Sequence, residues 1–139
     1  MADDIVHASC VAAHGRAILI IGPSGSGKSA LALQLMALGA MLVADDRTIL
    51  SKRGGVLTAS CPDTLSGLIE ARGIGILTAV VAQPTPVAYI VDMETAEPDR
   101  LPPVRHYTLM GLPIPLIYRS DGVGFASSLM LLLQGGRHA

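Results

Sequence analysis

The sequence is poor in aromatic residues, with no Trp, one Phe and three Tyr among 139 residues. Since half of the residues are hydrophobic, the core must be built from Leu, Ile, Val and Ala. Proteins that bind single-stranded nucleic acid stack the bases on aromatic side chains, and few are present here. An excess of basic charge is also missing, because ten Lys and Arg face eleven Asp and Glu. A nucleic acid is therefore not expected as a partner.

Cysteines and long apolar runs are scarce as well. The two cysteines, Cys10 and Cys61, lie in apolar or small-residue surroundings without zinc-site spacing, and we expect two buried, reduced thiols. The apolar runs 17–21 and 129–133 are too short to span a bilayer, and the acidic start Met-Ala-Asp-Asp is unlike a secretory signal. These features predict a cytoplasmic protein with no membrane partner.

The order of the predicted elements indicates the fold class. No linker or repeat interrupts the chain, so we expect a single domain over residues 1–139. Strands and helices alternate early and strands dominate later, which predicts an α/β protein with a mixed sheet flanked by helices. The patterns predict helices over 28–38, 62–68 and 124–133, loops over 70–75 and 96–103, and strands over 5–13, 17–21, 41–44, 48–50, 56–59, 76–81, 87–91, 106–110 and 114–118.

A phosphate-binding loop is the most specific pattern in the sequence. The residues Gly22, Pro23, Ser24, Gly25, Ser26, Gly27, Lys28 and Ser29 fit the pattern Gly, four residues, Gly-Lys-Ser. Glycines let several backbone N–H groups turn toward one anion, and the following helix N-terminus adds further donors. Lys28 can reach the terminal phosphates of ATP, and the Ser29 hydroxyl can bind Mg²⁺. A glycine-rich turn with a stray lysine is the alternative, which the strand–loop–helix context disfavours.

Two consecutive acids, Asp45 and Asp46, end the strand that follows the predicted phosphate-loop helix. In doubly wound sheets, ligands bind at the C-terminal edge of the strands, so these carboxylates should approach the phosphates. One acid can hold magnesium directly or through water, and the other can take a proton from an attacking hydroxyl. Since neighbouring residues of a strand point to opposite faces, we expect the two acids to have different roles. An exposed acidic turn is the alternative.

Two further segments resemble a known family. Leu42-Val43-Ala44-Asp45-Asp46, together with Leu68–Ile76 and its Glu70-Ala71-Arg72-Gly73-Ile74-Gly75 core, resembles the HPr kinase/phosphorylase family over roughly residues 7–100. The resemblance implies a fold like the HPr kinase catalytic domain, of the PEP carboxykinase-like type. It also implies ATP-dependent phosphorylation of a serine on an HPr-type phosphocarrier protein of a phosphotransferase system, the reverse removal of that phosphate, and a homo-hexamer.

The same resemblance assigns roles to single residues. It implies that Asp46 is the general base of phosphorylation, that Lys28 contacts the phosphates, and that His7 belongs to the active site. Ser29 and Glu70 match magnesium ligands, and Arg100 in Pro98-Asp99-Arg100-Leu101 matches a catalytic arginine. The bland alternatives are a partly buried His7, a surface pair of Glu70 with Arg72, and a solvated Arg100. Segment 69–78 matches a loop implicated in both reactions.

The chain also departs from the family pattern. Only six residues precede His7, so we expect the catalytic domain alone. Segment 115–122 diverges from the family's C-terminal motif, which weakens the expectation of dephosphorylation. Two other function classes remain open. A small-molecule kinase would normally carry an Arg-rich lid, which is not evident, and a regulatory nucleotide-binding module of the GTPase type would need Asn-Lys-x-Asp, although the chain contains no Asn.

Overall fold

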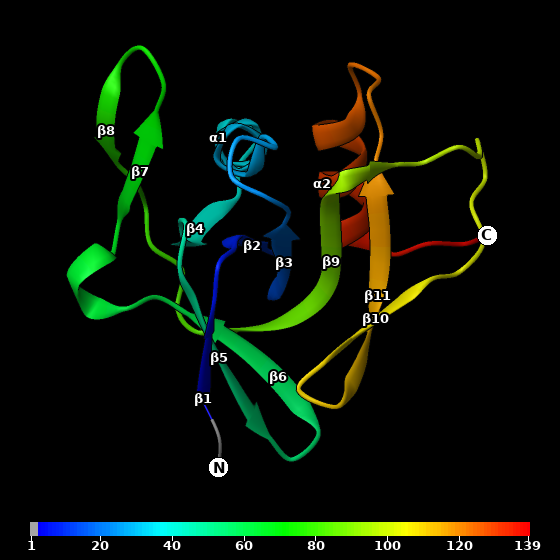
Figure 1. Ribbon diagram of the computed structural model, residues 1–139, viewed down its shortest axis with the longest axis horizontal. Helices are drawn as coiled ribbons and strands as arrows, with labels where there is room; N and C mark the ends of the chain where they lie inside the picture. Colours follow the sequence, from blue (N-terminus) through cyan, green and yellow to red (C-terminus); the bar gives the residue numbers. More distant parts are fainter. Residues whose placement is uncertain (1–2) are drawn as a thin grey trace.

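The computed structural model describes residues 3–139 and has a mixed α/β architecture, as the sequence predicts. Figure 1 shows a curled sheet with two helices on one side. The elements in chain order are β1 (Asp3–Val6), β2 (Ser9–Ala13), β3 (Arg16–Ile21), α1 (Lys28–Ala37), β4 (Met41–Ala44), β5 (Thr48–Arg53), β6 (Val56–Ser60), the 3-10 turn η1 (Asp63–Leu65), β7 (Leu68–Ala71), β8 (Gly75–Thr78), β9 (Thr85–Ala96), β10 (His106–Leu109), β11 (Leu112–Arg119) and α2 (Phe125–Gly135).

The long strand β9 joins the parts of the main sheet. Its first residues pair antiparallel with β6, and its middle pairs in parallel with β3 on one side and β11 on the other. The main path runs β1-β5-β6-β9-β3-β2-β4, while β10 pairs with β11 beside it. In Figure 1 the sheet curls so that β1, β5 and β6 lie below the strands that carry the helices.

Alternating side chains of the central strands fill two separate cores. On β3, Ala17 and Leu19 pack with β5 and β6 residues on one face, whereas Ile18 and Ile20 pack under α1 and α2 on the other. This division follows from the two-residue period of a strand. The apolar run 17–21 is therefore covered on both faces, as predicted.

Glycine-containing turns set the lengths of the elements. His14 and Gly15, at φ 55° and 73°, join β2 to β3 in a two-residue hairpin, and Gly54 and Gly55 do the same for β5 and β6. The end of α1 is closed by Gly39 at φ 113°, with backbone bonds from Gly39 to Met36 and from Ala40 to Leu35. The predicted end of the helix 28–38 is confirmed to within one residue, and a hairpin joins the predicted strands 48–50 and 56–59.

Three sequence-based boundaries are wrong. The predicted strand 5–13 is two strands, because the chain turns at His7 from a pairing with β5 to a pairing with β3 and β4. Only 63–65 of the predicted helix 62–68 is helical, as a single 3-10 turn. The predicted loop 70–75 and strand 76–81 are wrong in their bounds, because residues 68–71 and 75–78 pair as the hairpin β7–β8, a separate two-stranded sheet. Figure 1 shows this hairpin standing away from the main sheet, next to α1.

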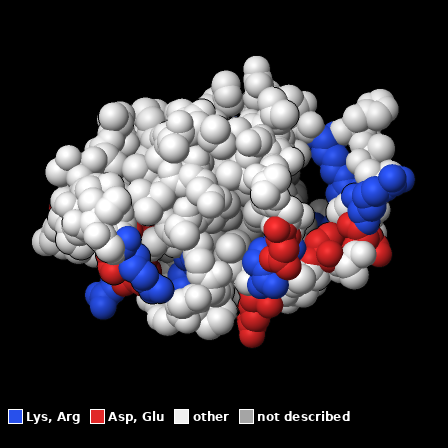
Figure 2. All heavy atoms as spheres, turned by 90° about the horizontal axis from the view of Figure 1, so that it is seen from above, with Lys and Arg blue, Asp and Glu red and all other residues white. Residues whose placement is uncertain are grey.

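The surface view gives the distribution of charge on one face. In Figure 2 most of that face carries no charged side chain, and Lys, Arg, Asp and Glu lie mixed along one margin. No one-sign field therefore dominates this face. Among residues 3–139, no helix combines the length and the apolar character that crossing a membrane would require.

Candidate functional site

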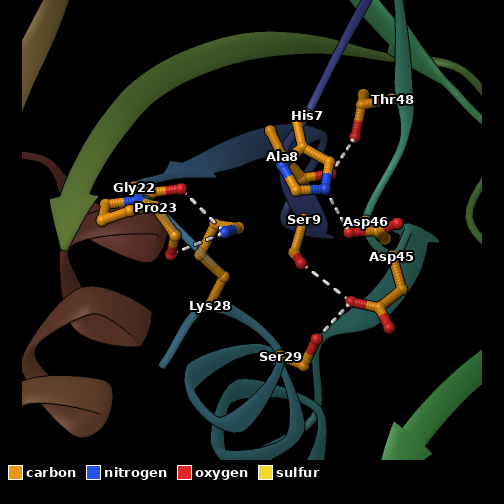
Figure 3. A network of polar contacts seen from close by, with 10 residues as sticks. All are labelled: His7, Ala8, Ser9, Gly22, Pro23, Lys28, Ser29, Asp45, Asp46 and Thr48. Carbon is orange, nitrogen blue, oxygen red and sulfur yellow. Dashed lines mark hydrogen bonds and ion pairs between the residues drawn. The ribbon is translucent and has the colours of Figure 1, made fainter. Parts of the chain in front are cut away.

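Strand direction brings three chain segments to one edge of the sheet. The strand β2 runs antiparallel between β3 and β4, with Ser9 opposite Ile20 and Cys10 opposite Ala44. The start of β2 therefore lies beside the ends of β3 and β4. The glycine-rich loop 22–27 follows β3 and the two acids follow β4, so the residues around Ser9 lie at the same edge as both, and His7 and Ser9 contact the acids (Figure 3).

The glycine-rich loop 22–27 needs its first glycine for a steric reason. Gly22 has φ 146°, and a Cβ atom there would lie 2.6 Å from Ser26 Oγ and 3.2 Å from Met93 Cβ. Gly27, at φ 100°, precedes the first turn of α1, which has no side-chain cap and no acidic residue. Backbone N–H groups in that turn have no partner within the helix, so they are available to an anion.

Two buried polar groups of the described chain, one in this loop and one directly after it, lack an anionic partner or any hydrogen bond. Lys28 is 7% exposed, and its Nζ donates to Gly22 O at 2.7 Å and Pro23 O at 3.1 Å. Within residues 3–139, Lys28 forms no ion pair with a carboxylate. Ser26 Oγ is buried without a hydrogen-bond partner in the same part of the chain. A buried ammonium held only by neutral carbonyls favours an anion nearby.

The first acid, Asp45, accepts two hydroxyl groups on a single oxygen atom. Ser29 Oγ donates to Asp45 Oδ1 at 2.7 Å, and Ser9 Oγ donates to the same atom at 2.8 Å. Figure 3 shows the carboxylate between the first turn of α1 and the start of β2. Because Ser29 donates its proton to Asp45, the lone pairs of Ser29 Oγ are free to bind a cation.

The second acid, Asp46, faces a different partner. His7 Nε2 lies 2.6 Å from Asp46 Oδ1, and both side chains are more than half exposed, at 53% and 59%. β4 ends at Ala44 and Asp46 adopts φ 67°, so the alternation of a strand does not separate the two acids. The turn is fixed by a bond from Ala8 N to Asp46 O at 3.0 Å. Asp46 is thus presented to solvent while Asp45 is tied into the network.

Two adjoining hollows connect these residues with the hairpin β7–β8. A cavity of about 270 Å³ is lined by Ser24, Gly25, Gly27, Lys28, Ser29, Ala30, Leu33, Asp46, Glu70 and Arg72. A neighbouring hollow of about 430 Å³ is lined by Ser29, Asp45, Asp46, Leu65, Leu68, Ile69, Glu70 and Ile76. Glu70, exposed on β7, therefore shares both spaces with Ser29 and Asp46. The structure brings most of the predicted site residues together.

The oxygen groups around these hollows fit a magnesium ion whose coordination shell is completed by a bound ligand. Within residues 3–139, no group of three or more His, Cys, Asp or Glu is arranged to hold a metal alone. Mg²⁺ in nucleotide sites uses one or two carboxylates, with water and substrate phosphates filling its shell. The Ser29 hydroxyl and the carboxylates of Asp45 and Glu70 are donors of this hard oxygen type.

One predicted residue lies elsewhere. Arg100 lines a different cavity, together with Glu97, Asp99 and Arg137, in the segment between β9 and β10. The structure does not bring Arg100 to the cavity beside Lys28, and the arginine that lines that cavity is Arg72. Sequence reasoning gave no role to Ser9, and it named Arg72 only as part of the family-like motif or as the partner of Glu70 in a surface pair. The register of β2 against β4 would be needed to find Ser9, and the sequence does not show it.

Comparisons with known proteins identify the family to which the chain is similar. The family model for the HPr Serine kinase C-terminal domain matches residues 1–98. An HPr kinase/phosphorylase from Clostridium novyi is 36% identical over 102 residues, which are 68% of this chain and 33% of that protein. One from Bordetella pertussis is 47% identical over 73 residues, 52% of this chain and 24% of that protein. The match thus spans a third or less of these relatives.

A solved structure extends the likeness over nearly the whole chain. The Hpr(Ser) kinase/phosphatase from Coxiella burnetii is similar with a TM-score of 0.78 at 25% identity, covering 94% of both chains. The similarity therefore continues past residue 98 into β10, β11 and α2. Since the family model covers well over half of the sequence and the fold agrees, this chain belongs to the family of the HPr serine kinase C-terminal domain.

Proposed function

We propose that this chain is an ATP-dependent protein kinase that phosphorylates a serine of an HPr-type phosphocarrier protein. The observation that carries the proposal is that the two consecutive acids have different partners. Asp45 accepts the hydroxyl of Ser29 beside the glycine-rich loop, while Asp46 is exposed, pairs with His7 and lines the cavity that Lys28 and Ser29 also line. One acid is placed to serve a phosphate-bound cation, and the other to serve an incoming hydroxyl.

The nucleotide would occupy the glycine-rich loop 22–27 as a phosphate loop, on a sheet of the PEP carboxykinase-like type. The free N–H groups of the first turn of α1 and the buried Lys28 ammonium both favour a polyphosphate. The unpaired Ser26 hydroxyl lies in the same loop and would gain a partner from a phosphate oxygen. Binding of a phosphate would therefore give both the Lys28 ammonium and the Ser26 hydroxyl a partner and reduce the free-energy cost of burying them.

Magnesium would be held by Ser29 and Glu70, with Asp45 contributing directly or through water, and would neutralise charge on the phosphates. The remaining chemistry belongs to the side chains. The serine hydroxyl of the partner attacks the γ-phosphorus, its proton passes to Asp46 Oδ, and the bond to the ADP oxygen breaks in line. His7 Nε2, at 2.6 Å, orients the Asp46 carboxylate for that proton. Arg100 as a stabiliser of the transferring group stays a prediction.

The partner and the reverse reaction are proposed from the relatives. Those from Clostridium novyi and Bordetella pertussis are named HPr kinase/phosphorylase, and the solved relative is named a kinase/phosphatase. We propose an HPr-type carrier as the substrate and phosphate removal as a second activity of the same site. Location in the cytoplasm and assembly into a homo-hexamer also belong to this proposal, and the mass of the protein in solution tests the assembly.

The deciding experiment is transfer of labelled γ-phosphate from ATP to a purified HPr-type carrier, with Asp46→Asn as the matched variant. Asparagine tolerates the φ of 67° at this position and keeps the shape of the side chain, but cannot accept the proton. We expect labelled serine with the native chain, and a loss of about 10²–10⁴-fold in the variant, with ATP binding retained. Binding of ATP without any labelled carrier would instead support a regulatory nucleotide-binding module or a small-molecule kinase.

A further inference from the structure

We propose that Ser9 is a positioning residue that sets the magnesium affinity of the site by fixing the Asp45 carboxylate. This inference rests on the proposed function, because it assigns the Asp45–Ser29 pair to Mg²⁺-bound ATP. Ser9 carries no chemistry of its own in this proposal. It acts through the 2.8 Å hydrogen bond from its hydroxyl to Asp45 Oδ1.

The position of Ser9 follows from the sheet register. β2 pairs with β4 through Cys10 and Ala44, and continuing this antiparallel register by one residue places Ser9 opposite Asp45. The bond from Ala8 N to Asp46 O shows that the two segments stay together beyond the last strand pair. On the other side of β2, Ser9 pairs with Ile20, near the end of β3. Ser9 is therefore held between the strands that carry the glycine-rich loop and the acids.

Burial makes the Ser9 hydroxyl a fixed donor. The residue is 0% exposed, so solvent does not compete for its proton, while Asp45 is only partly buried. A hydroxyl has one proton, and here it points at a carboxylate oxygen, which strengthens the bond relative to a neutral pair. The rotation of Asp45 is restrained from the sheet side, independently of any ligand.

The restraint passes to Ser29 through the shared acceptor atom. Ser29 Oγ donates to the same Asp45 Oδ1 at 2.7 Å, so the direction of its proton depends on where that oxygen is held. With the proton so directed, the lone pairs of Ser29 Oγ face away from Asp45 Oδ1, and Ser29 lines the hollow that Asp45 and Glu70 also line. Partners that orient metal ligands in this way typically change metal affinity about 10–100-fold when removed.

The test measures how Mg²⁺ changes ATP affinity, by calorimetric titration of ATP at a series of Mg²⁺ concentrations and in EDTA. The variants are Ser9→Ala, which removes the hydroxyl, and Ser9→Cys, which keeps the volume with a much weaker donor. Thr85→Val is the control, because it also removes a mostly buried hydroxyl, one that donates to Gln83 O at 2.7 Å away from the site.

We expect both Ser9 variants to need about tenfold more Mg²⁺ for the half-maximal gain in ATP affinity. Their ATP affinity in EDTA should match that of the native chain, and Thr85→Val should be native in both measurements. If the Ser9 hydroxyl only stabilised the fold, its removal would not change the Mg²⁺ dependence of ATP affinity selectively. If Ser9→Ala does not fold, Ser9→Cys gives the same comparison.

The outcomes separate this inference from the proposed function. Native Mg²⁺ dependence in a folded Ser9 variant would overturn the role of Ser9 and leave the kinase proposal intact. Loss of ATP affinity in EDTA to the same degree as with Mg²⁺ would also overturn it, because the defect would then lie in the loop. A native chain whose ATP affinity does not respond to Mg²⁺ would overturn both.

Discussion

His7 and Asp46 meet at 2.6 Å between Nε2 and Oδ1, across the point where the chain enters β2 and leaves β4. They belong to segments 39 positions apart in sequence, held in place by the bonds from Ala8 N to Asp46 O and from Thr48 Oγ1 to Ala8 O. The backbone therefore sets this pair, although both side chains are exposed.

The first prediction concerns the coupling of these two residues. If His7 acts by orienting Asp46, His7→Ala should slow phosphate transfer about tenfold in the native background and have little further effect in Asp46→Asn. Residues that act through each other are not additive in a double-mutant cycle. The measurement is the single-turnover transfer rate of the four proteins. Additive losses would mean that His7 acts separately, for example on the phosphate of the substrate.

A second prediction compares the two arginines. Arg72 lines the cavity next to Lys28, whereas Arg100 lines another cavity. We expect Arg72→Ala to raise the Kd for Mg²⁺-ATP several-fold and Arg100→Ala to leave it at the native value. Calorimetric titration of each variant measures this. An equal effect of the two would show that the segment of Arg100 reaches the nucleotide, and the transfer rates then test its predicted catalytic role.

A third prediction concerns the first glycine of the loop. Gly22→Ala adds a Cβ within 2.6 Å of Ser26 Oγ at φ 146°, a conformation that an alanine rarely adopts. The free energy of unfolding should fall by about 1–3 kcal/mol, and ATP binding should be lost. Gly124→Ala is the matched control, since its φ is −94° and a Cβ there meets open space.

Gly124→Ala should stay within about 0.5 kcal/mol of the native chain. Urea unfolding at equilibrium measures both variants, and thermal unfolding with and without Mg²⁺-ATP reports the loss of binding. A Gly22→Ala protein as stable as Gly124→Ala would contradict the steric argument for the loop.

A fourth prediction concerns pH. Burial raises the pKa of the Cys10 thiol far above its usual range. Above about pH 8.5 the unfolded chain loses the thiol proton, whereas the folded chain keeps it. The contribution of Cys10 to the free energy of unfolding is therefore complete below about pH 8.5 and declines above that. The free energy of unfolding should fall more steeply with alkaline pH in the native chain than in Cys10→Ala, by up to about 1.4 kcal/mol per pH unit.

Urea unfolding under reducing conditions at several pH values above and below 8.5 gives the two slopes. The pKa of Cys61 is also raised, by partial burial and by the nearby Asp63 charge, but this contribution is present in both proteins and cancels. Parallel curves would mean that Cys10 is exposed to water in the folded chain. Cys61 is half-buried, so only one of the two expected buried thiols is fully buried.

Features of the structure that depend on residues adjacent in sequence could be predicted from the sequence. The turn His14-Gly15, the helix end at Gly39 and the loop 22–27 each depend on glycine conformations that leave a mark in the sequence. The contact of Ser9 with Asp45 left no such mark, because it follows from a strand order that places β2 between β3 and β4. The segment 70–75 contains Gly73 and Gly75 and is predicted as a loop, yet the cross-strand pairs of β7 and β8 are regular.

The pairing of β9 with both β3 and β11 has a consequence for synthesis on the ribosome. β3 can pair with β2 as soon as the hairpin at His14-Gly15 emerges, but its other edge stays open until residues 87–92 have been made. At about 5–20 residues per second, that delay lasts several seconds. During this time an apolar strand, Ala17–Ile21, is exposed to other nascent chains, so we expect productive folding in the cell to depend on chaperones that bind extended apolar segments.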